Sequence, residues 1–304
     1  MKNISLPTRR DMVSILGEDF FKEEVICDFL VTEKMKKIWA VNMDIYLEFA
    51  QLCEKHNLRY YAYGGTLLGA IRHKGFIPWD DDMDVCMPRA DYEEFLKIAQ
   101  KELSEPFFLQ TPLTEKGCYR TQARVENMKT TRILTFFKNS GMSHGLILDV
   151  FPLDDCVPES NEQDIKEIWV HAKRCSQYLK RNNTDIMTPE HYDSWKKHMT
   201  DKPMEEWETV QRIAKKNMNS NTDYYSMKVV VYPGCKYNTP VKKELFKSVE
   251  KVEFEKIEIQ IPTGYDEFLT ATYGDYMQFP PVEQRGAWHG GLILDPERPY
   301  TDYL

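Results

Sequence analysis

The sequence predicts an α+β protein in which helices flank a mixed β-sheet and a helical insertion interrupts the chain. Three patterns indicate this class. Residues 34–56 carry apolar side chains at helical spacing, and residues 83–87 alternate apolar and polar side chains with the period of a strand. Residues 161–220 return to a helical pattern with many mixed charges. Since no internal repeat stands out, we expect one α+β core with an insertion.

The first half of the chain predicts a helix, a strand and a glycine turn in succession. The apolar stripe of residues 34–56 is typical of an amphipathic helix, and residues 1–60 as a whole look mainly helical. The aromatic-rich run 58–63 indicates a strand that leads into the glycines. Further elements are expected as a helix at 66–73, a turn at 75–78, a strand ending at Pro88, a helix at 91–103 and strands at 107–110, 119–126, 133–137 and 146–151.

The second half separates an insertion from a C-terminal segment. The tail predicts β-like runs at 228–232 and 252–261 and a helix at 265–273. We expect residues 1–304 to form a single unit. Its parts are predicted as a core at 34–160, a helical insertion at 161–225 and a C-terminal segment at 226–304 that completes the core.

Composition and charge argue against several classes of protein. A net charge of −8 disfavours general nucleic-acid binding, which rewards basic surfaces. The seven cysteines are spread singly without a CxxC pair, so we expect neither zinc nor a disulfide framework. No apolar run approaches the ~20 residues that span a bilayer, and residues 1–10 lack the apolar core of a signal peptide. We expect a cytoplasmic protein.

A glycine turn marks the start of the predicted helix at 66–73. Gly64, Gly65 and Thr66 leave backbone N–H groups accessible at a helix N-terminus, which favours binding of a phosphate. Arg72 and His73 follow one to two turns later and are further candidates for substrate contact. Arg72 suits a bidentate clamp on phosphate, and a surface salt bridge is the alternative.

Four aspartates follow this helix at residues 80, 81, 82 and 84. In a strand, Asp82 and Asp84 would share one face, which makes them the best pair of metal ligands. Asp80 has the same parity and is a further candidate ligand, whereas Asp81 would point the other way and play a structural part. Because like charges this dense repel one another, a divalent cation is the simplest way to offset them.

Three other interpretations of these acids fit the sequence less well. A calcium loop needs glycine at its sixth position and usually glutamate at its twelfth, where this chain has Val85 and Asp91. An aspartyl-phosphate phosphatase would place its nucleophile after a buried apolar strand, but here the apolar alternation follows the acids. A solvated acidic turn remains the third alternative.

Asp149 is the acid most suited to complete a metal site with Asp82 and Asp84. It lies inside the apolar run 146–151, and an acid in such a run is either paired or functional. Asp154 and Asp155 are expected past the end of the strand, as loop acids. Among the cations, Arg124 is favoured over Arg120 and Lys129 for contact with a donor phosphate, and His289 is either a substrate contact or a core histidine.

The chain resembles the LicD family, the phosphocholine transferases of bacterial surface polysaccharides, whose eukaryotic relatives are fukutin and the fukutin-related protein. The resemblance rests on three segments, at 64–72, 78–84 and 148–154, and on a weaker match at 265–281. It implies a nucleotidyltransferase-like fold that places the carboxylates on adjacent strands. It also implies Mg²⁺ or Mn²⁺ held by Asp82, Asp84 and Asp149, with Asp80 as an extra ligand. The scattered cysteines place the chain with the bacterial members and not with the zinc-binding branch.

The resemblance further implies what the single catalytic unit does. An alcohol phosphate, phosphocholine as first choice, would pass from a CDP-alcohol to a hydroxyl of a lipid-linked or surface glycan, such as a precursor of lipopolysaccharide, teichoic acid or capsule, and CMP would leave. Asp149 would take the hydroxyl proton. The transfer would then take place at the inner face of the bacterial membrane.

Other functions stay open at this point. A nucleotidyltransferase would use the same acids to move an NMP from an NTP and would release pyrophosphate. A non-enzymatic nucleotide-binding module and a glycosyltransferase with an Asp-x-Asp motif are less favoured, because the acids are intact and no βαβ unit begins the chain. The basic residues of the insertion suit contact with anionic lipid or the acceptor, or a solvated helix face. These residues are Lys166, Lys173, Arg174, Lys180 and Arg181.

Overall fold

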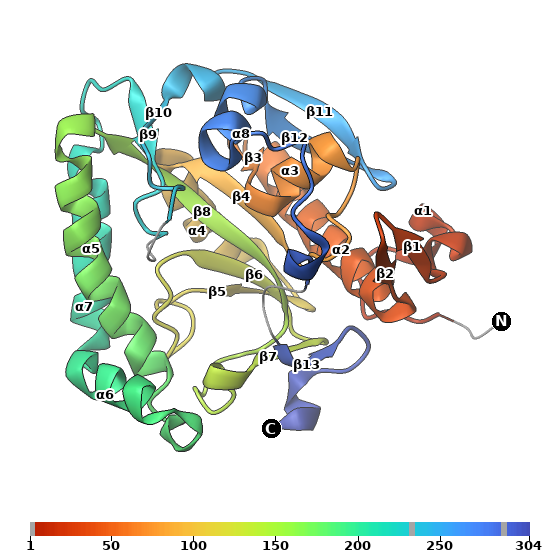
Figure 1. The fold of residues 1–304 in the computed structure, drawn as a ribbon, viewed down its shortest axis with the longest axis horizontal. Helices are drawn as coiled ribbons and strands as arrows, with labels where there is room; N and C mark the ends of the chain where they lie inside the picture. The colour runs from red at the N-terminus through yellow and green to blue at the C-terminus, as the bar shows by residue number, and fades with distance from the viewer. Residues whose placement is uncertain (1–3, 231–234, 287–290) are drawn as a thin grey trace.

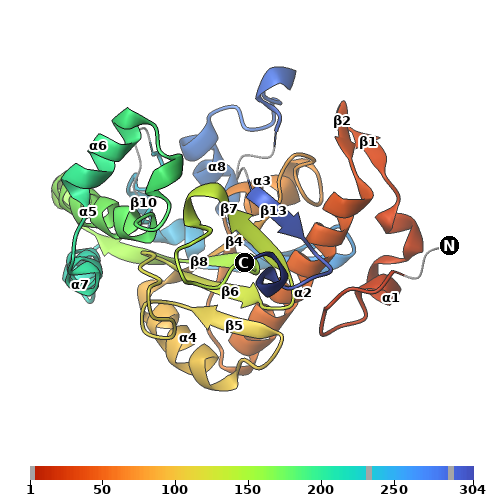
Figure 2. The same cartoon turned by 90° about the horizontal axis from the view of Figure 1, so that it is seen from below.

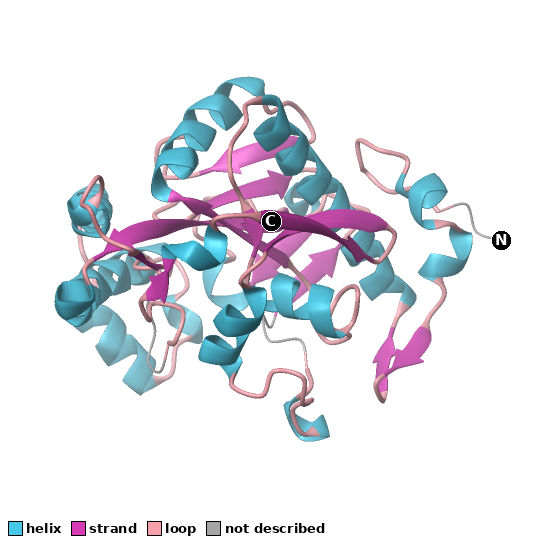
Figure 3. Ribbon diagram, turned by 90° about the horizontal axis from the view of Figure 1, so that it is seen from above, coloured by secondary structure: helices cyan, strands magenta, loops and turns pink. Residues whose placement is uncertain are grey.

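The computed structural model describes residues 4–230, 235–286 and 291–304. A mixed sheet runs through the molecule with helices on both sides of it (Figures 1 and 3), so the fold is α+β, as the sequence predicts. The α-helices are α1 (Met12–Leu16), α2 (Glu33–Lys55), α3 (Gly64–Arg72), α4 (Arg89–Glu102), α5 (Pro158–Leu179), α6 (Pro189–His198), α7 (Pro203–Ala214) and α8 (Tyr265–Tyr273).

The central sheet combines strands from the predicted core with two short strands of the later chain. Its members in the described residues are β3 (Tyr61–Ala62), β4 (Met83–Pro88), β5 (Phe107–Gln110), β6 (Ala123–Asn127), β8 (Leu146–Cys156), β9 (Tyr224–Ser226) and β10 (Val241–Lys242). They follow the order β10-β9-β8-β4-β3, and β6 joins β5 to β8. β4 and β8 run parallel, and the other pairs are antiparallel.

Three hairpins or two-stranded sheets lie around this core. They pair β1 (Glu24–Ile26) with β2 (Phe29–Val31), β11 (Val249–Phe254) with β12 (Ile257–Pro262), and β7 (Thr131–Leu134) with β13 (Gly291–Asp295). The expectation of a mainly helical stretch at 1–60 therefore misses β1 and β2. The β-like run expected at 252–261 is a hairpin with a turn at Glu255, whose positive φ of 56° marks the reversal.

β8 is the strand around which the site is built. Along one edge it pairs with β4, and along the other β6 covers Leu146–Val150 and β9 covers Asp154–Cys156. Between these two partners lies Pro152, which has no N–H to donate. The position of Pro152 between β6 and β9 explains why a proline is tolerated inside a strand of 11 residues.

The sequence prediction was wrong about where β8 ends. Asp154 and Asp155, expected as loop acids, both lie within the strand. Asp154 is fully buried and accepts a hydrogen bond from Nε of Arg89 at 2.7 Å, and Asp155 pairs with Lys243 at 2.7 Å. The cation that allows Asp154 to be buried comes from α4, far along the chain, so the local sequence gave no sign of it.

α2 is the long amphipathic helix that the sequence predicts, and it holds the acidic loop in place. Thr32 caps its N-terminus by accepting a hydrogen bond from the backbone N of Met35 at 3.2 Å. From its buried face, Nε1 of Trp39 donates to the backbone oxygen of Asp80 at 2.8 Å. Nδ2 of Asn42 donates to the backbone oxygen of Asp81 at 2.9 Å. The segment that carries the acids is therefore fixed to the core through its main chain.

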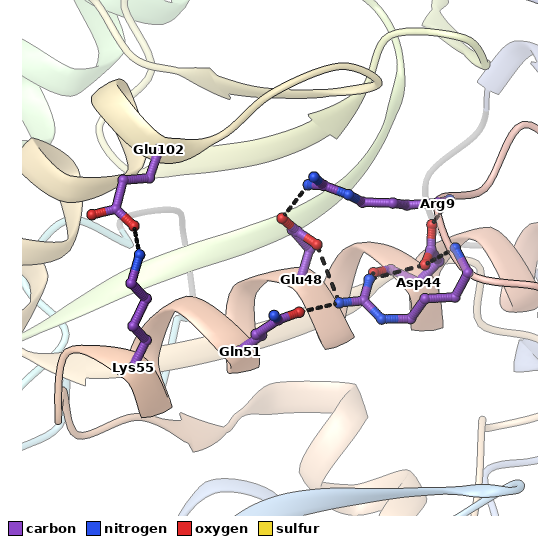
Figure 4. Close-up of polar contacts among 7 residues, drawn as sticks. Arg9, Asp44, Glu48, Gln51, Lys55 and Glu102 are labelled. Atoms are coloured by element: carbon purple, nitrogen blue, oxygen red, sulfur yellow. Dashed lines mark hydrogen bonds and ion pairs between the residues drawn. The ribbon is translucent and has the colours of Figure 1, made fainter.

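The N-terminal segment is fastened to the other side of α2. Arg9 pairs with Glu48 at 2.6 Å, and Arg10 bridges Asp44 and Glu48, each at 3.1 Å (Figure 4). Asp44 is fully buried, and backbone N–H groups of both arginines also reach its carboxylate. These contacts hold the segment before α1 against the core.

The predicted insertion forms a separate helical group. α5, α6 and α7 lie together at one end of the molecule, opposite the hairpin of β1 and β2 (Figures 1 and 2). A buried ion pair between Asp164 of α5 and Lys228, at 3.0 Å, attaches this group to the chain that follows β9. The exact boundaries at 161 and 225 stay a prediction.

The C-terminal part agrees in places with the sequence. α8 spans the residues expected for it. The β-like run expected at 228–232 begins in a turn and ends outside the described residues, and the strand of this region is β9, a few residues earlier. Among the described helices, none combines the length and apolar character needed to cross a membrane.

Candidate active site

Three side chains form a row across the central sheet. Asp84 of β4 lies directly opposite Asp149 of β8, and Asp149 lies directly opposite Arg124 of β6. Register partners on adjacent strands point to the same face of a sheet, which brings these groups together. Asp82, just before β4, joins them: a carboxylate oxygen from each of Asp82, Asp84 and Asp149 lies within 4.8 Å of the others. The predicted grouping of these three acids is confirmed.

A second group of carboxylates lies beside the first. Oxygens of Asp80, Asp81 and Asp82 also lie within 4.8 Å of one another, so Asp82 belongs to both groups. The expectation that Asp81 points away was wrong, because β4 begins only at Met83 and the alternation of a strand does not extend to residues 80–82. Asp80 adjoins the row through Asp82.

The carboxylates of Asp149 and Asp84 are neutralised to different extents by the cations around them. Burial would raise the pKa of Asp149, but the Arg124 charge and hydrogen bonds from Arg124 and Gln122 hold it below its usual range. Burial, followed by repulsion from Asp82, Asp149 and Asp80, raises the pKa of Asp84 well above its usual range. Arg132 approaches Asp82 at 3.3 Å. The cations around the acids therefore leave negative charge at Asp84 uncompensated.

This donor set fits a hard divalent cation. Mg²⁺ and Mn²⁺ prefer carboxylate oxygens, and three of these converge here in a largely buried position. Burial, followed by repulsion from the neighbouring carboxylates, raises the pKa of Asp84, and the positive charge of a bound cation would oppose this shift. Asp82, Asp84 and Asp149 are the residues that would hold the ion, with Asp80 beside them. That a cation binds there stays a prediction.

Gly64 and Gly65 make room for the carboxylates. A Cβ on Gly65 would lie 2.4 Å from Oδ2 of Asp80, and a Cβ on Gly64 would lie 3.0 Å from Oδ2 of Asp84. Gly64 also has a φ of +54°, which disfavours other residues. The N-terminus of α3 thus sits against the acids, so a ligand held there would touch both. Phosphate binding by these glycines stays a prediction.

Thr66 has a definite partner in the structure. Its Oγ1 accepts a hydrogen bond from the backbone N of Asp84 at 2.8 Å, and the backbone N of Tyr63 donates to the backbone oxygen of Asp84 at 3.0 Å. Thr66 is buried. The contact fixes the start of α3 to β4 and holds Asp84 in position.

Arg72 and His73 face the C-terminal segment. Arg72 Nη1 donates to the backbone oxygens of Tyr276 at 2.9 Å and Gln278 at 3.1 Å, and its guanidinium lies 5.2 Å from the ring centre of Phe279. His73 stacks on the same ring, and burial, then Arg72, lowers its pKa to about 4. Among the residues that the structure describes, Arg72 makes no salt bridge, and its guanidinium donates to these backbone oxygens instead. A role in substrate binding stays a prediction for both residues, and His289 lies outside the described residues.

Two polar residues of the site were not expected from the sequence. Gln122 Nε2 donates to Oδ1 of Asp149 at 3.0 Å, and Arg132 of β7 reaches Asp82. Gln122 lies just before β6, where the period of a strand no longer holds, so the sequence gave no signal for its contact with Asp149. Arg132 gave no signal either, because its strand pairs with β13 and lies outside the central sheet.

The fold and the row define a nucleotidyltransferase-type domain. A family model described as "LicD/FKTN/FKRP, nucleotidyltransferase domain" matches residues 57–152, which hold α3, the acids, Arg124 and Asp149. A lipopolysaccharide cholinephosphotransferase LicD of Haemophilus influenzae is 31% identical over 79% of this chain and 90% of its own length. An uncharacterized protein of Rickettsia typhi is 46% identical over 48 residues, which cover 16% of each chain.

The chain belongs to the LicD family and is a transferase of the LicD type. The resemblance inferred from the motifs at 64–72, 78–84 and 148–154 is confirmed.

Proposed function

We propose that the protein transfers phosphocholine from CDP-choline to a hydroxyl of a cell-surface glycan precursor and releases CMP. The observation that carries this proposal is the row of Asp84, Asp149 and Arg124 with Asp82 beside it, in a chain similar to a lipopolysaccharide cholinephosphotransferase over most of its length. A lipid-linked acceptor would bring the protein to the inner face of the membrane as a peripheral protein.

The chemistry needs a proton acceptor and a place for negative charge. The acceptor oxygen forms a bond to the phosphorus of phosphocholine, and the bond from that phosphorus to the oxygen of the CMP phosphate breaks. Because Arg124 keeps Asp149 ionised at neutral pH, its carboxylate is available to take the hydroxyl proton. Backbone N–H groups at the start of α3 would donate hydrogen bonds to phosphate oxygens.

A divalent cation would supply charge neutralisation between the acids and the phosphates. Asp82, Asp84 and Asp149 would hold it, with Asp80 as an additional ligand. Thr66 keeps Asp84 in place through its backbone, and Gln122 and Arg124 orient Asp149. Arg72 and His73 join the end of α3 to the segment after α8, and these contacts hold the helix in place.

The identity of the reaction product tests this proposal. We would incubate the protein with Mg²⁺, a glycan acceptor lacking phosphocholine, and CDP-choline, CDP-ethanolamine, CDP-glycerol or CDP-ribitol in parallel, with CTP and ATP as comparisons. ³¹P NMR should show CMP and a new phosphodiester with CDP-choline. CMP from another CDP-alcohol would change the donor, and pyrophosphate from CTP or ATP would favour the nucleotidyltransferase alternative.

A further inference from the structure

A cavity of about 360 Å³ lies between α5 and the segment that leads into β6. Thr121 before β6 and Val229 after β9 both line it, and Oγ1 of Thr121 donates to the backbone oxygen of Val229 at 3.1 Å. In Figures 1 and 2 the loop between β5 and β6 runs beside α5 and α7. The cavity has a volume typical of small-molecule sites.

The cavity gathers positive charge from three side chains. Arg120, Lys173 and Lys180 line it, and among the described residues none of the three makes an ion pair. Nε of Arg120 is buried without a hydrogen-bond partner in the described part of the chain. Burial, then the charge of Lys173, lowers the pKa of Lys180. Burial, then Arg124, lowers the pKa of Arg120 to about 10. An anion would relieve each of these unfavourable interactions.

Aromatic and amide groups complete the wall. Trp169 and Tyr119 line the cavity with part of their rings accessible, and Gln122 and Gln177 add amide groups that both donate and accept hydrogen bonds. Three lysines of α5 and its C-terminal cap differ in their surroundings. Lys166 pairs with Glu162 at the surface, at 2.6 Å, whereas Lys173 and Lys180 turn toward the cavity. A planar base that carries phosphates matches this combination of rings, amides and cations.

Gln122 connects the cavity to the acidic row. It lines the cavity, and its Nε2 donates to Oδ1 of Asp149 at 3.0 Å. If the phosphates of a ligand lie near Arg120, they therefore point toward the acidic row. The quaternary ammonium of choline is a cation and would be repelled by Arg120, Lys173 and Lys180, so the alcohol end of a donor belongs on the other side of the row.

We propose that this cavity binds the pyrimidine nucleoside diphosphate part of the donor, with the base against Trp169 and the phosphates toward Arg120 and Lys180. The proposal rests on the proposed function, which supplies the CDP-alcohol donor. It assigns nucleotide recognition to the helical insertion and leaves recognition of the alcohol to other residues.

The test is CMP binding by isothermal titration calorimetry, which needs no acceptor and no turnover. Lys180→Met and Arg120→Met keep the apolar stems and remove the charges, and Trp169→Leu removes the ring. Lys166→Met is the matched control, because Lys166 is an exposed lysine of the same helix. We expect at least a tenfold weaker affinity for CMP in Lys180→Met and Trp169→Leu, and wild-type affinity in Lys166→Met. Since Arg120→Met removes a partly buried side chain, circular dichroism would show whether it folds, and Lys173→Met is the substitute if it does not.

The outcomes separate this proposal from the proposed function. Unchanged CMP affinity in the cavity variants, or no CMP binding by the wild-type protein, would overturn the assignment of the cavity as a nucleotide site. A raised KM for the glycan acceptor with an unchanged KM for the donor would also overturn it and make the cavity an acceptor site. CMP binding that depends on Lys180 and Trp169, without transfer from any CDP-alcohol, would support the cavity assignment while the proposed function fails.

Discussion

Arg124 holds the carboxylate of Asp149 with two hydrogen bonds, Nε to Oδ1 at 2.8 Å and Nη2 to Oδ2 at 3.1 Å, from the neighbouring strand. From its position in the sequence, Arg124 is expected to contact a donor phosphate. The structure gives it a partner within the protein, and this pairing keeps one acid of the row ionised while Asp84 is driven toward protonation. Arg124 thereby makes the carboxyl group of Asp149 more acidic than the neighbouring carboxyl group of Asp84.

Replacing Arg124 should change the pH dependence of transfer. Without its charge, burial would raise the pKa of Asp149, so the ionised form would be lost at a higher pH as the pH falls. We expect Arg124→Met to shift the acidic limb of the kcat/KM profile upward. Arg124→Lys keeps the positive charge but cannot make both hydrogen bonds to the carboxylate. We expect its kcat to fall roughly 10- to 100-fold and its acidic limb to shift less than that of Arg124→Met. A profile that superimposes on that of the wild type would show that the pair does not set the ionisation of Asp149.

Asp84→Asn should abolish turnover and leave the fold intact. Because it removes one of several mutually repelling charges, we also expect the free energy of unfolding in EDTA to rise by about 1 kcal/mol. Mg²⁺ should raise the melting temperature of the wild-type protein but not that of the variant. Asp201→Asn, at an exposed aspartate, is the control and should behave as wild type in all three measurements. Wild-type turnover by Asp84→Asn would remove the basis of the metal site.

Gly65→Ala tests the close approach of α3 to the acids. The added methyl group would meet Oδ2 of Asp80 at 2.4 Å, so either the helix or the carboxylate must move. We expect kcat/KM to fall by about 100-fold, as misplacement by about 1 Å does at other active sites. Gly286→Ala is the matched control, because no atom of the described residues lies within 4 Å of the added Cβ. Equal activities of the two variants would mean that the start of α3 is not critical.

Glu126 should make folding stability depend on pH. Burial, followed by repulsion from Glu115, raises its pKa to about 7 from an ordinary value of 4.5. A raised pKa means that the folded protein binds more protons than the unfolded chain between these values. The contribution of Glu126 to stability is therefore complete below about pH 4.5 and is lost as the pH rises to 7.

Urea unfolding of the wild-type protein and of Glu126→Gln, at pH 5 and pH 7.5, measures this contribution. Relative to the wild type, the variant should become more stable at the higher pH, by on the order of 3 kcal/mol. A difference in unfolding free energy that is the same at both pH values would show that Glu126 titrates normally in the folded protein.

Local patterns predicted the parts of the fold that depend on neighbours in sequence. The alternation of residues 83–87 predicted the strand that carries Asp84, the apolar run around Asp149 predicted β8, and helical spacing gave α2 and α8. The same alternation failed for Asp81, because it was extended to residues that precede the strand. A period of two predicts the direction of side chains only for residues that lie within a strand.

The parts that could not be predicted depend on partners distant in sequence. Asp154 can be buried in β8 because Arg89 reaches it from α4, and Arg72 is held by backbone oxygens after α8. Pro152 suggested the end of a strand, but β8 continues because its neighbouring strand changes at that point. Each case needs knowledge of which segments lie side by side, which the sequence of the segment itself does not contain.

The row across β4, β8 and β6 also bears on how the protein acquires activity. Its members come from three separate stretches of chain, and α4 and the strands β5, β6 and β7 lie between β4 and β8 in the sequence. Pairing of this kind forms slowly, because a long loop must close before any contact compensates for the lost chain entropy. A nascent or partly refolded chain can thus contain much of its helix and still have no active site. Recovery of enzymatic activity after dilution from denaturant would report the assembly of the parallel strands, and helix signals would recover earlier.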